Sequence, residues 1–144
     1  MNPVDQTTFG KGEGNCMAAC VASILEIALE EIPDIRGDDQ YGLLCLWLAG
    51  RGYGITDITF KPRIKPKDGT LVAWGQGYYI GGGKSPRGDF DHAVVMCSGG
   101  IVHDPHPSRA GIEDIDSLTF LTPTYDPKWT EQLREHLTKK GVKT

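Results

Sequence analysis

The sequence predicts an α+β fold, with N-terminal helices packed on an antiparallel β-sheet and a further helix at the C-terminus. Two observations carry this prediction. The first third of the chain holds two long apolar segments, and the following part holds short runs rich in β-branched and aromatic residues, separated by Gly, Pro and Asp. The first pattern is typical of buried helices and the second of strands. With 144 residues, 39% of them hydrophobic, the chain is long enough for one core, so we expect a single domain over residues 1–144.

The two apolar segments predict the N-terminal helices. Residues 16–29, CMAACVASILEIAL, are apolar on every helical face, which predicts a buried helix that begins at Cys16. Residues 40–54, QYGLLCLWLAGRGYG, predict a second helix, with Asp39 as its N-cap and a glycine cluster at its end.

Six short runs predict the strands: ITDITF, GTLVAW, GYYI, HAVVMC, IVHD and LTFL. No crossover helix fits between them, so we expect an antiparallel meander. A last amphipathic helix is predicted over residues 127–140, where Asp126 and Pro127 suit its N-cap and first position.

Charge and composition narrow the possible partners. The net charge of −4 gives no global field that favours nucleic acid, and no apolar run approaches the roughly 20 residues needed to cross a bilayer. We therefore expect no nucleic-acid and no membrane partner, and a cytoplasmic location. The four cysteines are expected as reduced thiols, because the chain has the apolar content of a core and no export signal. The oligomeric state stays open.

The stretch GEGNCMAAC places Cys16 at the predicted start of a helix. Unpaired backbone N–H groups and the helix dipole lower the pKa of a thiol there, and the thiolate is the nucleophilic form. The glycines before it allow a substrate to approach the backbone closely. The alternative is a small buried residue, since free cysteines are among the most buried residue types.

The stretch DFDHAVVMCSGGIVHDPHP supplies a base and a carboxylate. A three-residue hairpin loop formed by Cys97, Ser98 and Gly99 would place His92 opposite Asp104 on one face of the sheet. A two-residue loop would change the parity and separate them. A histidine beside a carboxylate supports an imidazolium next to a thiolate, although both are also common polar residues at strand ends.

Together these motifs resemble the papain-like cysteine peptidase superfamily: a GNC turn that runs into an alanine-rich helix, HAVV far downstream, and DP at the end of the next strand. They are most similar to the bacteriocin leader peptidase domains attached to ABC transporters, over about residues 6–107. The resemblance implies that Cys16 is the nucleophile, His92 the general base and Asp104 the residue that orients His92. It also implies an upstream glutamine that binds the oxyanion; Gln6 is the only glutamine before Cys16, and Asn15 is the alternative.

The combined prediction is a cysteine hydrolase that cleaves a peptide, isopeptide or related amide bond of a peptide or protein substrate. The reaction passes through a thioester and needs no metal or organic cofactor. Two other classes stay open: a thiol-dependent acyltransferase, and a papain-like binding module that has lost turnover.

Two further motifs are weaker. GGGKS at residues 81–85 lacks the earlier glycine and the following helix of a phosphate-binding loop, so we reject that function. Cys16 and Cys20 with His103 and His106 are residue types that bind zinc. We weigh zinc lower, because Cys20 falls within a buried helix and His103 alternates to the face opposite Asp104.

Overall fold

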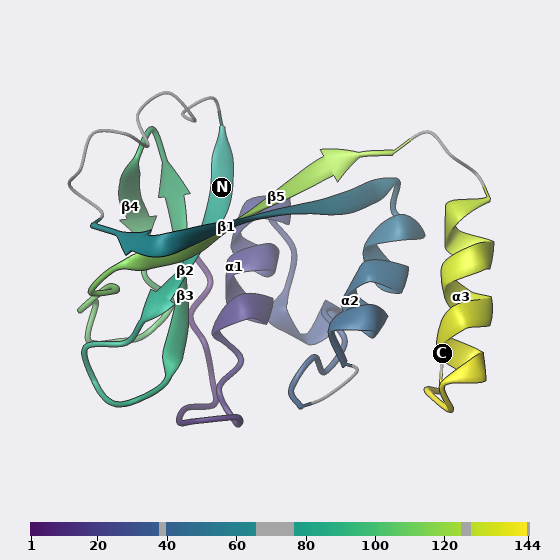
Figure 1. The fold of residues 1–144 in the computed structure, drawn as a ribbon, viewed down its shortest axis with the longest axis horizontal. Coiled ribbons are helices and arrows are strands. Elements are labelled where there is room, and N and C mark those ends of the chain that lie inside the picture. The colour runs from purple at the N-terminus through teal and green to yellow at the C-terminus, as the bar shows by residue number, and fades with distance from the viewer. Residues whose placement is uncertain (38–39, 66–76, 125–127, 144) are drawn as a thin grey trace.

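The computed structural model describes residues 1–37, 40–65, 77–124 and 128–143. Over these residues the fold is α+β, with three α-helices and a five-stranded antiparallel sheet (Figure 1). The elements in chain order are α1 (Cys16–Leu25), the 3-10 helix η1 (Leu29–Glu31), α2 (Gln40–Ala49), β1 (Tyr53–Ile64), β2 (Tyr78–Lys84), β3 (Asp91–Cys97), β4 (Gly100–His103), β5 (Ile115–Pro123) and α3 (Trp129–Lys139). None of the helices in these ranges is long and apolar enough to cross a membrane.

The strand order in the sheet is β1-β5-β2-β3-β4, and every pair is antiparallel. Only β2, β3 and β4 follow one another as predicted, so a meander over the whole sheet is wrong. β5 instead returns between β1 and β2. Its residues Ile115 and Leu118 are fully buried, and a strand that buries its apolar residues so completely is stabilised in the interior of a sheet and not at its edge. The predicted strand GTLVAW falls on residues 69–74, which lie outside the described ranges.

The first helix begins at Cys16 as predicted, but it ends at Leu25, four residues earlier than expected. Glu26 takes the left-handed conformation, with φ 58° and ψ 42°, and its N–H donates to the carbonyl of Ala22. Such a cap usually falls on glycine, so the sequence carries no visible stop signal here. The N-terminal ammonium of Met1 lies 2.6 Å from the Glu26 carboxylate and helps to hold this turn.

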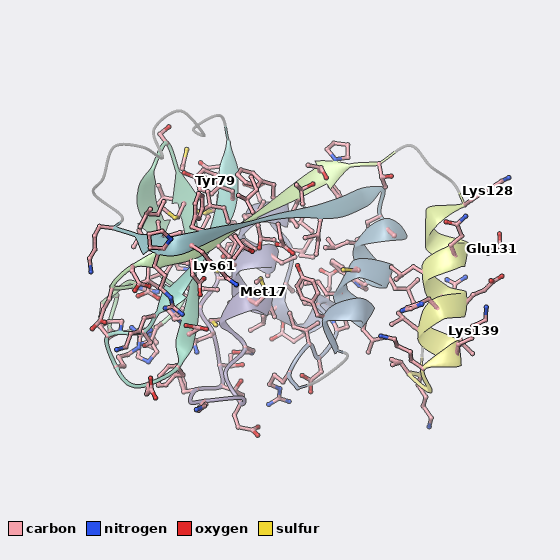
Figure 2. All side chains as sticks on the ribbon, viewed as in Figure 1. Met17, Lys61, Tyr79, Lys128, Glu131 and Lys139 are labelled. Atoms are coloured by element: carbon pink, nitrogen blue, oxygen red, sulfur yellow. The ribbon has the colours of Figure 1, made fainter. Side chains whose placement is uncertain are left out.

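The helices cover different parts of the sheet. α1 packs on β2 and β3, whereas α2 lies against β1 on one side and α3 on the other. α3 packs on α2 at the end of the molecule, where Lys128, Glu131 and Lys139 point away from α2 (Figure 2). The caps predicted for α2 and α3, at Asp39 and at Asp126 with Pro127, lie outside the described residues; α2 begins at Gln40 and α3 at Trp129.

Both faces of the sheet are buried at β3. Ala93 and Val95 belong to the core formed with α1, and Val94 and Met96 belong to a second core on the other side, together with Leu118. β3 therefore reads as an unbroken apolar run, which fits a central strand with two covered faces. The polar His92 sits at the start of this strand.

The glycines of the GGGKS motif lie within β2, with no helix after them. They allow β2 to pack tightly between β3 and β5. A Cβ atom at Gly83 would lie 1.8 Å from the backbone carbonyl oxygen of Asp114, an overlap that no side-chain rotation can relieve.

Replacing Gly83 by alanine should therefore destabilise the protein by about 2 kcal/mol or more, because backbone has to move to admit the methyl group. Urea denaturation measures the loss as a lower midpoint. Gly50→Ala is the matched control, since the nearest atom to a Cβ there lies 3.5 Å away. Equal midpoints for the two variants would show that β2 is not packed as described.

Candidate active site

Cys16 is the first residue of α1, and it borders the same two hollows as His92. Hydrogen bonding from the backbone of Met17 and of Ala93 is among the influences that lower the pKa of its thiol. As a first-turn residue, Cys16 has a backbone N–H without an acceptor inside the helix, so this group is also available to a ligand. The predicted position of the thiol at a helix N-terminus is confirmed.

Opposing effects act on the Cys16 thiol. Burial raises its pKa, while the hydrogen bond and the charge of His92, together with the two backbone donors, lower it. The net result is a pKa below the ordinary value of a thiol. A lowered pKa increases the thiolate fraction near neutral pH, which is what a nucleophilic cysteine needs.

His92 connects Cys16 to Asp104. Its Nε2 lies 2.7 Å from Asp104 Oδ1, and both side chains are about 4% exposed or less. Because Nε2 carries the proton donated to the carboxylate, Nδ1 is the ring nitrogen that remains for Cys16. Burial lowers the pKa of His92, but the contacts with Asp104 and Cys16 outweigh it and raise the pKa above its usual value. A raised pKa favours the imidazolium that pairs with a thiolate.

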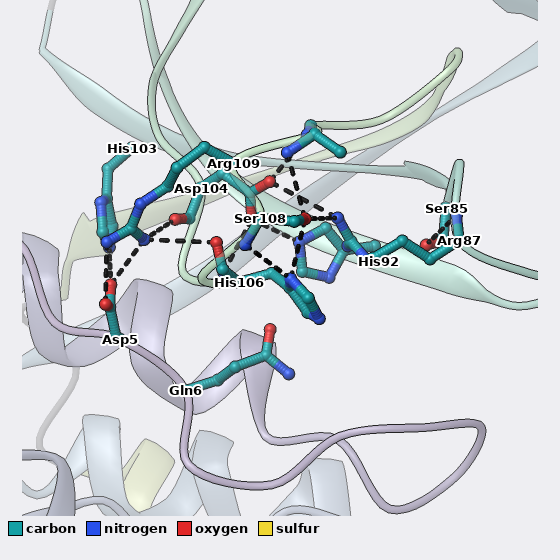
Figure 3. Close-up of polar contacts among 12 residues, drawn as sticks. Asp5, Gln6, Ser85, Arg87, His92, His103, Asp104, His106, Ser108 and Arg109 are labelled. Carbon is teal, nitrogen blue, oxygen red and sulfur yellow. Dashed lines mark hydrogen bonds and ion pairs between the residues drawn. The ribbon is translucent and has the colours of Figure 1, made fainter.

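The Asp104 carboxylate is fully engaged. Oδ1 also accepts a hydrogen bond from the N–H of His106 at 2.8 Å, and Oδ2 accepts one from the N–H of Gly111 at 2.7 Å (Figure 3). Burial raises the pKa of Asp104, but His92 and these two N–H groups lower it to about 2. The carboxylate thus stays ionised and holds the His92 ring at neutral pH.

The turn that brings His92 and Asp104 together differs from the prediction. Cys97 pairs with Gly100, so the loop has two residues and not three, and Ser98 and Gly99 both have positive φ, as a type I′ turn requires. Such a turn alone would send Asp104 to the other face. However, the register shifts between Val95, which pairs with His103, and Met96, which pairs with Ile101.

One extra residue, Val102, is therefore accommodated within β4 as a bulge. The predicted turn had one residue more than the observed turn, and the extra residue of the hairpin lies in β4 instead. Side chains alternate between the two faces of a strand, so one inserted residue moves every later side chain to the other face. The bulge therefore cancels the effect of the shorter turn. His92 and Asp104 share a face for this different reason.

The N-terminal segment closes over the loop that carries Asp104. The Arg109 guanidinium binds both carboxylate oxygens of Asp5, at 2.6 and 2.8 Å, and also donates to the Asp104 carbonyl oxygen. The N–H of Gln6 donates to the carbonyl of Pro105 at 3.0 Å. These contacts fix Gln6 relative to the Asp104 loop.

The two candidates for the oxyanion side chain have different positions. Gln6 is buried, lines the same cleft as Cys16 and His92, and donates from Nε2 to the carbonyl of Thr8 at 2.8 Å. Asn15 does not line that cleft. Its amide accepts from the N–H groups of Thr7 and Thr8 and donates to the Thr7 hydroxyl, so it holds the N-terminal loop in shape.

Cys16 and His92 lie between two hollows. The larger is a cleft of about 950 Å³ between the N-terminal loop and the β2–β3 loop, whose residues Arg87 and Phe90 line it. The smaller, of about 360 Å³, is bordered by Met17, Gly82, Gly83 and Ser117. Cys16 and His92 are thus accessible from two sides.

The four residues considered as zinc ligands, Cys16, Cys20, His103 and His106, do not form a common metal site. Cys20 is fully buried, and His103 donates from Nε2 to the carbonyl oxygen of Val4 at 2.9 Å, so its ring holds the N-terminal segment. Within the described ranges no group of three or more His, Cys, Asp or Glu residues is arranged to hold a metal ion. All four cysteines are unpaired.

Nothing in the sequence indicated two residues near the site: Arg87 Nη1 lies 3.7 Å from Asp104 Oδ2, and Arg109 binds Asp5 and the Asp104 loop. His106, which the sequence suggested only as a possible zinc ligand, lines the larger cleft. Both arginines follow a motif residue within a few positions, but spacing alone does not show which way such loop side chains turn.

No family model, curated protein or solved structure matches this chain.

Acid should destabilise the protein through Asp104. Its folded pKa of about 2 lies below the ordinary 3.8, so the ionised carboxylate stabilises the folded state above about pH 4, and this stabilisation is lost as the pH falls toward 2. We expect a loss of roughly 2 kcal/mol from this group, measured by urea denaturation across that pH range.

Asp104→Asn should be less stable at neutral pH and should lose less stability in acid than the wild type. Asp91→Asn is the control, because the Asp91 side chain is 67% exposed. A wild-type pH dependence that survives intact in Asp104→Asn would contradict the network drawn around this carboxylate.

Proposed function

We propose that this protein is a papain-like cysteine hydrolase that cleaves an amide bond of a peptide or protein substrate. The observation that carries the proposal is the arrangement of three residues: Cys16 at the start of a helix and at the edge of a large cleft, His92 on the same cleft, and the buried Asp104 carboxylate that the His92 ring contacts at 2.7 Å. The opposite pKa shifts of Cys16 and His92 support it, because they favour a thiolate next to an imidazolium.

In the proposed reaction, the Cys16 thiolate attacks the carbonyl carbon of the amide. The S–C bond forms while the π electrons of the carbonyl move to its oxygen. The tetrahedral intermediate then collapses, the C–N bond breaks, and the leaving nitrogen takes the proton from His92. Water, deprotonated by His92, next attacks the thioester and releases the acid and the Cys16 thiol.

The charge on the tetrahedral oxygen needs hydrogen-bond donors. The Cys16 N–H at the start of α1 is one candidate, and the Gln6 amide, which lines the same cleft, is the other. Among the described residues the Gln6 amide donates one hydrogen bond, to the carbonyl of Thr8, so its second N–H is available. Asn15 is a weaker candidate, because its amide is bound to the N-terminal loop.

The two hollows suggest how a polypeptide would bind. A chain that crosses Cys16 would place one side of the scissile bond in the larger cleft and the other in the smaller groove. Gly82, Gly83 and Ser117 border the smaller groove on the side of the sheet. The same groove would suit an acceptor in an acyl-transfer reaction, so a thiol-dependent acyltransferase is the second candidate. We propose a cytoplasmic location, where thiols stay reduced.

Alkylation by iodoacetamide across a range of pH tests the proposal. Cys16 should react well below the pH at which an ordinary thiol ionises, and His92→Ala should move its reaction toward ordinary thiol behaviour. Asp104→Ala should lower the reactivity of Cys16 below neutral pH by roughly 10-fold or more, whereas Asp91→Ala should leave it unchanged.

Cys16→Ala provides the background from Cys45 and Cys97, which are partly exposed. Wild-type labelling that follows an ordinary thiol titration would support an inactive binding module in place of the hydrolase. Formation of a new amide when glycinamide is added, in place of hydrolysis, would favour the acyltransferase.

A further inference from the structure

His106 is a second histidine in the larger cleft. It lies two residues after Asp104, its ring centroid is 6.3 Å from that of His92, and Phe9 contacts it edge-on at 5.2 Å. The proposed reaction uses His92 and gives His106 no role.

The contacts of His106 fix which ring nitrogen carries the proton. Nδ1 accepts the backbone N–H of Ser108 at 3.1 Å and lies 2.9 Å from the Ser108 hydroxyl. That hydroxyl oxygen already accepts N–H groups from Arg87 and Ala110, at 3.1 and 3.4 Å. Its own proton is therefore directed to Nδ1, and the His106 proton is on Nε2.

The Nε2–H group faces the cleft without a partner among the described residues. Figure 3 shows the polar contacts of the ring at one nitrogen only, and the ring itself is half-buried. Burial and the positive charge of Arg87 lower the pKa of His106, and the charges of His92 and Arg109 lower it further. The negative charge of Asp104 raises the pKa, but the net shift is downward. The ring is thus a neutral donor of fixed orientation at neutral pH.

We propose that His106 binds the substrate, donating a hydrogen bond from Nε2 to an uncharged backbone carbonyl oxygen of the peptide that occupies the larger cleft. This inference rests on the proposed function and adds a specificity element to it. A neutral donor suits a neutral acceptor, and the Phe9 ring, which is 47% exposed, continues the same wall with apolar surface. A backbone carbonyl next to an apolar side chain, as an extended polypeptide offers, would contact both groups.

The same contacts argue against other roles for His106. With its proton on Nε2 and its Nδ1 lone pair bound to Ser108, the ring has no free lone pair with which to accept a proton or bind a metal ion. It does not duplicate His92.

The test uses quenched-fluorescent peptides of random sequence, which span both sides of the scissile bond. His106→Phe keeps the ring and removes the donor; it should raise the apparent KM roughly 10-fold and leave kcat nearly unchanged, as expected when a binding hydrogen bond is lost. His106→Gln restores an N–H near the Nε2 position and should recover most of the affinity. His136→Phe is the matched control, because His136 is exposed on α3 and does not line the cleft.

The reaction of Cys16 with 4,4′-dithiodipyridine, which offers no carbonyl oxygen, separates binding from effects on the triad. Its rate should be the same in wild type and His106→Phe. An equal loss in this rate and in peptide cleavage would overturn the proposal, since His106 would then act through His92. Unchanged peptide KM in His106→Phe would also overturn it, with the hydrolase left standing. A wild type that cleaves none of the peptides would overturn both.

Discussion

The hydrogen bond between His92 Nε2 and Asp104 Oδ1 is the interaction on which the site depends. It keeps the ring proton on the carboxylate side, so the other nitrogen is presented to Cys16. The carboxylate can do this only because the fold saturates it with the N–H groups of His106 and Gly111. A buried carboxylate without those donors would be protonated or expelled to solvent. The loop after β4 is therefore as much a part of the site as the strand that carries His92.

The parts of the site that a local pattern determines could be predicted from the sequence. The apolar run after Cys16 fixes a helix start, and a helix start acts on a thiol wherever the rest of the chain goes. The sequence could not show which of the two oxyanion candidates, Gln6 or Asn15, lines the cleft with Cys16. Their difference arises from the fold of the N-terminal segment, in which Arg109 binds Asp5, 104 residues away in the sequence. Sequence spacing contains no trace of such a contact.

The fold shows the same division. Five of the predicted strands and the three helices are present, because each depends on its own periodicity. The position of β5 between β1 and β2 could not be predicted, since pairing partners depend on which apolar faces meet in three dimensions. The early end of the first helix at Glu26 was missed for a related reason: an unfavourable backbone conformation there is stabilised by an ion pair with Met1, a residue distant in sequence.

The bulge at Val102 separates two properties of a residue that are usually considered together. The Val102 side chain is 47% exposed and is named in no interaction of the site, so its chemical identity matters little to His92 and Asp104. Its peptide unit, in contrast, sets the parity of the strand. Related proteins would be expected to vary freely in the type of amino acid at this position, yet to keep the chain length between the histidine and the aspartate. In this hairpin the number of residues between His92 and Asp104 matters more than the amino acid at position 102.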